Sequence, residues 1–153
     1  MLNILKNDNN HTKTLEQKYI QNDIDTLMDY FKKCKNLDSK KEARKKLLLY
    51  KLKELSLNSK NKEIHKVQQI LESNESYEAI KKILIYLNNL RVFSSIDSLI
   101  DIKIYKALLY EMLDIDIGAT NEYKEIIKLK NSKEIFELYH QFIERTINMN
   151  SIK

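Results

Sequence analysis

Glu137 and His140 come nearest to a metal-binding motif. They form E-x-x-H, the half-motif with which di-iron carboxylate bundles bring a carboxylate and an imidazole to one helix face. Such a site needs a second copy and two further inward glutamates. His65 has no glutamate three residues before it, and His11 lies in a polar stretch. We therefore expect no metal and no cofactor, with His140 a partly exposed histidine.

Cys34 is the other candidate for chemistry. It lies at an apolar position of a helical pattern with lysines beside it, and no histidine is placed nearby in the sequence to activate a thiolate. A small buried hydrophobe is the favoured interpretation. The chain also has no glycine-rich phosphate loop, no CxxC pair and no serine-centred elbow. We therefore expect no catalytic residue and no enzymatic activity.

Positive charge is concentrated in residues 32–62. This range holds twelve Lys or Arg against three acidic residues, a local charge of +9, whereas the rest of the chain carries −4. Such a run can track a phosphate backbone, although no aromatic residues for base stacking are interleaved with the basic residues of 40–46. The stretch predicts either weak, salt-sensitive contact with nucleic acid or a solvated surface. Its densest part is the basic patch Lys40, Lys41, Arg44, Lys45 and Lys46.

Composition limits the elements that can position these residues. The 153 residues are 42% hydrophobic and 32% charged, with one glycine and no proline, so the tight turns of strand-rich folds are nearly excluded. We expect an all-α fold, a single compact bundle of six to eight helices. No apolar run approaches a membrane span, and the lone cysteine excludes an intrachain disulfide. An intracellular, monomeric protein without membrane contact is predicted.

The stretch 76–113 shows the clearest helical periodicity. One apolar stripe runs from Tyr77 to Leu90, and we expect a short helical turn capped by Ser94 or Ser95 to follow it. Asp101 is predicted to cap a further helix. These closely connected helices must fold back on one another to bury their stripes.

Around this centre the sequence predicts a flexible tail over 1–11 and one helical domain over 12–150. Capping boxes predict helix starts at Thr14 and Ser39, and Asn131 with Glu134 opens the last helix. In the helix over about 40–57, Leu49 and Tyr50 widen the apolar face, which indicates packing on two neighbours. The loop over 114–120 contains Gly118, which we expect to supply a positive φ.

Three segments carry a resemblance to a known family. EIHKVQQIL (63–71), AIKKILIYLNNLRV (79–92) and SKEIFELYHQFIERTI (132–147) resemble the helical N-terminal domain of elongation factor TFIIS. That family includes the core of the Iws/Spn elongation factor and the integrase-binding domain of lens-epithelium-derived growth factor. KEARKKLLLYKLKEL (41–55) is similar to the extra helix of the Iws/Spn core.

The resemblance implies a non-catalytic protein-interaction module for transcription elongation, located in the nucleus. Such modules bind short, disordered, acidic and aromatic peptides through two inter-helix loops. Carried over to this chain, the loops place partner contacts at Leu71 and Glu72 and at Ile115 and Ile117. From the residues alone, the two isoleucines are equally able to close the core or to anchor a partner.

A different class also satisfies the pattern. A viral or bacterial helical effector, such as a small Bcl-2-like bundle or an inhibitor of a host or phage protein, needs no catalytic residue and binds through a groove between helices. A structure would distinguish the two classes, because the TFIIS-like module has no hairpin of helices buried at the centre of its bundle.

Overall fold

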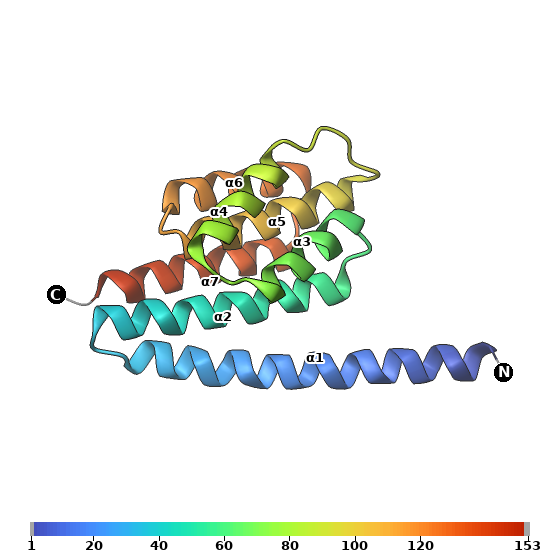
Figure 1. The fold of residues 1–153 in the computed structure, drawn as a ribbon, viewed down its shortest axis with the longest axis horizontal. Coiled ribbons are helices and arrows are strands. Elements are labelled where there is room, and N and C mark those ends of the chain that lie inside the picture. Colours follow the sequence, from blue (N-terminus) through green and yellow to red (C-terminus); the bar gives the residue numbers. More distant parts are fainter. Residues whose placement is uncertain (1, 152–153) are drawn as a thin grey trace.

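The chain is described by a computed structural model that covers the backbone of residues 2–151 and the side chains of residues 17–151. Seven α-helices make up 83% of the chain, and the described residues contain no strand. The expected all-α bundle of six to eight helices is confirmed. Figure 1 shows α2, α5, α6 and α7 running lengthwise, with α3 and α4 crossing over them and α1 lying along the outside of α2.

The first two helices, α1 (Leu2–Lys33) and α2 (Leu37–Asn58), form an antiparallel pair. α1 starts at Leu2, so the backbone expected to be a flexible tail over 1–11 is helical from residue 2, and Thr14 does not begin the helix. No glycine or proline interrupts that stretch. The predicted cap of α2 at Ser39 is wrong by three residues, because Asn36 is the N-cap and its side chain accepts a hydrogen bond from the Ser39 N–H.

The next two helices are short. In α3 (Lys62–Ser73) the Asn61 side chain caps the first turn, and in α4 (Tyr77–Asn88) the Ser76 hydroxyl does so. Each helix buries one stripe, as the spacing predicts, with Ile64, Val67 and Leu71 inward on α3.

The centre of the molecule is α5 (Ile96–Met112), which is capped by Ser95 as expected. The predicted break at Asp101 is wrong, because one continuous helix replaces the short turn and the second helix. Asp101 instead accepts a hydrogen bond from Ser59 Oγ at 2.7 Å. Nine residues of α5 are buried, on nearly all sides of the helix, because α2, α4 and α6 all pack around it.

The chain closes with α6 (Asp116–Leu129) and α7 (Lys133–Asn150). Gly118 does not adopt a positive φ; Asp114 does, at 60°. Gly118 lies inside α6, which begins at Asp116. The connection between α5 and α6 is therefore shorter than the loop expected over 114–120. α7 is capped by Ser132 rather than Asn131, through the Ile135 N–H.

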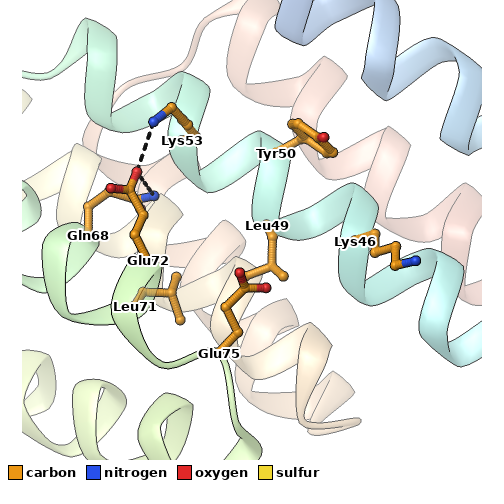
Figure 2. Close-up of a pocket in the computed structure, with 8 residues that line it drawn as sticks. All are labelled: Lys46, Leu49, Tyr50, Lys53, Gln68, Leu71, Glu72 and Glu75. Atoms are coloured by element: carbon orange, nitrogen blue, oxygen red, sulfur yellow. Dashed lines mark hydrogen bonds and ion pairs between the residues drawn. The ribbon is translucent and has the colours of Figure 1, made fainter.

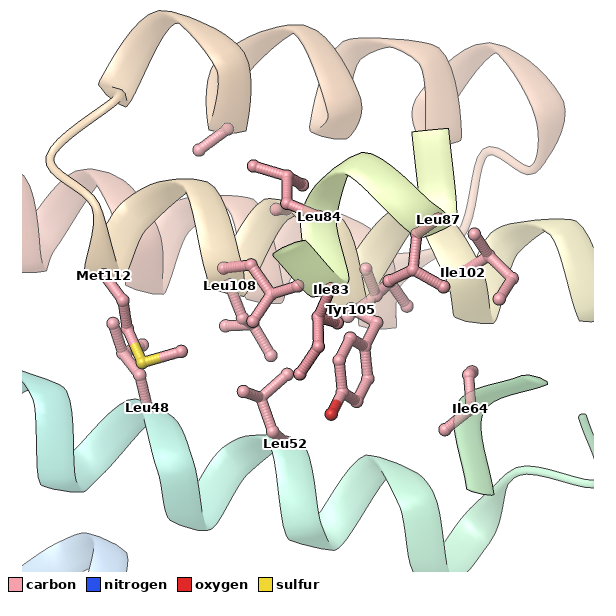
Figure 3. Packing of buried hydrophobic residues seen from close by; sticks show 14 of the residues in the cluster. Leu48, Leu52, Ile64, Ile83, Leu84, Leu87, Ile102, Tyr105, Leu108 and Met112 are labelled. Atoms are coloured by element: carbon pink, nitrogen blue, oxygen red, sulfur yellow. The ribbon is translucent and has the colours of Figure 1, made fainter. Parts of the chain in front are cut away.

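One apolar cluster joins α2 to α7, and Figure 3 shows its middle, where side chains of α2 and α3 face those of α4 and α5. Leu48, Leu52 and Tyr105 are all fully buried there. α1 contributes to two separate clusters, which reach Leu47 and Ala43 on the other side of α2. The prediction that α2 packs on two neighbours is therefore confirmed. None of the described helices is both long and apolar enough to cross a membrane.

Candidate functional site

A groove of about 430 Å³ lies between α2 and α3 and is called here the α2–α3 groove. α2 presents one face at i, i+3, i+4 and i+7, and α3 presents its last two turns. Figure 2 shows Lys53 of α2 reaching Glu72 of α3, with Leu49 on the side of α2 that faces Leu71. Its lining residues are Lys46, Leu49, Tyr50, Lys53, Gln68, Leu71, Glu72 and Glu75.

The Glu72 carboxylate is fixed in this groove by two donors. Lys53 Nζ lies 2.9 Å and Gln68 Nε2 lies 3.2 Å from the same oxygen, Oε1. The hydrogen bond from Lys53 is the main cause that lowers the pKa of Glu72. Gln68 is itself oriented from the core, because the buried Tyr105 hydroxyl donates to its Oε1 at 2.8 Å. Within the described residues Oε2 receives no hydrogen bond, so it can accept one from a ligand.

The apolar part of the groove comes from both helices. Leu71 is 1% exposed and belongs to the core, so it supports the floor without offering much surface. Leu49 is half-buried and Tyr50 is 36% exposed, so these two give a ligand its apolar contact. The exposed Lys46 adds a cation at the rim. The groove thus combines an apolar wall, a free carboxylate oxygen and an ammonium group.

Ile115 and Ile117, the other two predicted contact residues, do not line this groove. Ile115 is the N-cap residue of α6 and is 40% exposed, and Ile117 lies in the first turn and is 74% exposed. Neither is a core residue, so the core interpretation of these two isoleucines is wrong, while their contact with a partner stays a prediction. The preceding Asp114 is held by Arg44 and by Lys41, the latter at 3.7 Å.

α2 contacts both segments that were predicted to bind a partner, the one with Leu71 and Glu72 and the one with Ile115 and Ile117, at different turns of the helix. Arg44 binds Asp114 just before α6, and Lys45 Nζ lies over the ring of Tyr77, 4.6 Å from its centroid, at the start of α4. Lys53 binds Glu72 nine residues further along α2, a rise of about 13 Å. The structure therefore brings Leu71 and Glu72 into one groove and leaves Ile115 and Ile117 beyond its end.

The basic patch is not a continuous charged surface. Lys40 is 2% exposed, with Nζ 5.0 Å from the Phe31 ring centroid, and Arg44 is 4% exposed. Both are buried because α1 and the core enclose α2 from two sides. Lys41 and Lys45 are half-buried and occupied by Asp114 and Tyr77, which leaves Lys46 as the exposed member of the patch.

The candidate metal and thiol residues are scattered. Glu137 and His140 are exposed on α7, Cys34 is half-buried, and His65 Nε2 lies 2.7 Å from the Ser59 carbonyl oxygen. Among the residues whose side chains are described, no three His, Cys, Asp or Glu come together as a metal site would require. The side chain of His11 lies outside the described residues.

Comparison with known proteins gives no relative: no family model matches the chain, and no curated protein or solved structure matches it. The groove geometry must therefore carry the functional argument. Sequence reasoning missed Lys53, Gln68 and Tyr50 as groove residues. The signal for Tyr50 was present, because Leu49 and Tyr50 widen the apolar face of α2; the pairing of Lys53 and Gln68 with Glu72 has no local signal.

Proposed function

We propose that this chain is a non-catalytic protein-interaction module that binds a short linear peptide of a partner protein in the α2–α3 groove. The observation that carries the proposal is the fixed Glu72 carboxylate, whose Oε2 receives no hydrogen bond among the described residues, in a groove that the exposed Tyr50 also lines. A peptide is recognised by an apolar anchor together with polar groups that fix its backbone.

Each part of the groove has a role in this proposal. The anchor side chain packs on Leu49 and Tyr50, while a peptide N–H donates to Glu72 Oε2. Lys46 donates to a carboxylate or carbonyl of the peptide. Because Lys53 and Gln68 already hold Glu72, the acceptor is preorganised and little side-chain entropy is lost on binding.

The resemblance to TFIIS-type modules extends the proposal to an adaptor of transcription elongation in the nucleus. Two features support it over the alternatives. Only α5 is buried on nearly all sides, whereas α6 keeps Lys124, Glu125 and Lys128 exposed, so the described helices form no buried central hairpin of the Bcl-2 kind. Burial of Lys40 and Arg44 leaves little of the basic patch for nucleic acid.

A displayed library of random linear peptides tests the proposal. Peptides enriched on the native chain should bind Glu72→Ala and Tyr50→Ala about tenfold more weakly or worse, because truncated anchor contacts typically cost at least about 1–2 kcal/mol. Ile85→Ala, which removes an exposed side chain of α4, is the matched control and should bind normally. Failure to enrich any peptide, or equal binding by all variants, would overturn the proposal.

The same variants separate binding from folding. Tyr50 and Glu72 are exposed, so their truncation should leave the melting temperature within the range of ordinary surface changes. Leu71→Ala is unsuitable as a binding test, because removing a core leucine destabilises by about 2–5 kcal/mol. Ile115→Ala measures whether the ligand extends past the groove toward α6.

A further inference from the structure

α7 presents apolar side chains on two neighbouring sides, about 100° apart around the helix. Its inner side packs Ile135, Phe142 and Met149 against the rest of the molecule. On its outer side Phe136 is 47%, Ile143 38% and Ile147 64% exposed. A helix needs only one apolar side to join a bundle, so the outer side is unpartnered among the described residues.

The outer residues follow the spacing of a helix-pairing seam. Phe136, His140, Ile143 and Ile147 are separated by four, three and four residues, which is the alternation that lines up along the contact between two packed helices. Phe136, His140 and Ile143 line an open hollow of about 590 Å³, whose other lining residues also belong to α7. A hollow of this kind receives side chains from a facing helix. We call these four residues the α7 seam.

The charges along the seam decide what can cover it. Glu137 and Glu144 lie along one edge, and Glu144 is held by Lys32 of α1 at 3.2 Å. Lys133 lies in line with the seam, one turn before Phe136. A second copy packed antiparallel would place Glu137 against Glu144 of the other chain, and a parallel copy would place the two Lys133 side chains together. Like charges oppose self-pairing in both orientations.

We propose that the α7 seam is a docking site for an amphipathic helix of a partner protein, one with an apolar seam of the same spacing and basic residues along the edge that faces Glu137. This site is separate from the α2–α3 groove, so it gives the chain a second partner surface. The two sites would allow the chain to connect a linear peptide to a helical protein.

The probe is a synthetic three-heptad helical peptide with leucine along its seam and lysine at the flanking positions, compared with a peptide that has glutamate there instead. Binding to the full chain is measured by fluorescence anisotropy. The lysine peptide should bind more tightly than the glutamate peptide, and added salt should reduce that preference. Glu137→Lys should reverse the preference between the two peptides.

Ile143→Ser should weaken binding of the lysine peptide at least about tenfold, as expected for a residue at the centre of a packed interface. Ile85→Ser changes a more exposed isoleucine on α4 and should leave binding unchanged. Sedimentation of the native chain should give a monomer. Equal binding of both peptides, unaltered binding by Ile143→Ser, or a dimer that Ile143→Ser dissociates would each overturn the proposal.

Discussion

Gly118 shows how a single residue sets the distance between two helices. A β-carbon at this position would lie 2.6 Å from Cδ1 of Tyr110, closer than real contacts allow. Tyr110 cannot turn away freely, because its hydroxyl accepts a hydrogen bond from Asn88 Nδ2 at 3.1 Å. Glycine inside a helix costs about 1 kcal/mol relative to alanine. The close approach of α5 and α6 offsets that cost.

We expect Gly118→Ala to lower the free energy of unfolding by about 1 kcal/mol, because overpacking outweighs the gain in helix propensity. The same change made in a Tyr110→Ala background should instead be stabilising, since the clash is gone. Urea unfolding of the four proteins of this double-mutant cycle measures both signs. A stabilising effect in the native background would show that Tyr110 is not the obstacle.

Lys51 is a cation in a place that disfavours its charge. Its Nζ donates to Gln141 Oε1 at 3.1 Å between α2 and α7. Burial, followed by the nearby Arg145 charge, lowers the pKa of Lys51 to about 8. At neutral pH the folded chain therefore carries a proton that the unfolded chain holds more tightly.

Replacing Lys51 with Met should raise the free energy of unfolding at neutral pH by about 1–2 kcal/mol, after allowance for the lost hydrogen bond. The native chain gains stability as pH rises through about 8 toward the unfolded value, because its folded state then holds fewer protons than its unfolded state. The advantage of the variant should accordingly shrink by about pH 10. Lys82→Met, at an exposed position, should show no such change.

At the scale of elements, α1 is attached to a core that is closed without it. The main apolar cluster contains none of the α1 side chains that the structure describes, residues 17–33; the buried ones among them meet α2 and the end of α7 in two smaller clusters. Figure 1 also shows the N-terminal half of α1 extending past the end of α2. α7 differs, because Arg145 reaches the core and its Nε and Nη2 each lie 2.8 Å from the Glu111 carboxylate.

Deletion of residues 1–35 should therefore leave a cooperatively unfolding, helical chain with a lower melting temperature and more binding of a hydrophobic dye, because Ala43 and Leu47 become exposed. Deletion from residue 133 onward should abolish cooperative unfolding, since it removes part of the core and leaves Glu111 buried without its partner. Circular dichroism during thermal unfolding distinguishes the two. A non-cooperative transition in the first deletion would show that α1 is part of the core.

The sequence predicts elements better than it predicts their connections. Apolar spacing locates α3, α4 and the inward side of α7, because each buries a single stripe. It places a break at Asp101 because a helix buried on many sides, such as α5, has no clear stripe to follow. The fixed position of Glu72 was not predictable, since it depends on Lys53, 19 residues away, and on Tyr105 acting through Gln68 across 37 residues.

At the scale of the whole molecule, two tyrosines make the stability of the folded chain depend on pH in the alkaline range. Tyr105 is fully buried and Tyr123 is 1% exposed. Burial is the main cause that raises the pKa of both hydroxyls well above the usual value of about 10. The folded chain therefore keeps two protons that the unfolded chain releases, and its stability must fall as pH rises above about 10.

Alkaline titration followed by tyrosinate absorbance should consequently show two phases among the nine tyrosines. The first comes from tyrosines at the surface while the helices are intact. The second should coincide with the loss of helical circular dichroism, because Tyr105 and Tyr123 ionise only when the core opens. Tyr105→Phe and Tyr123→Phe should each reduce the second amplitude by one tyrosine and move unfolding to higher pH. Ionisation of all tyrosines before any loss of helix would contradict the burial of this pair.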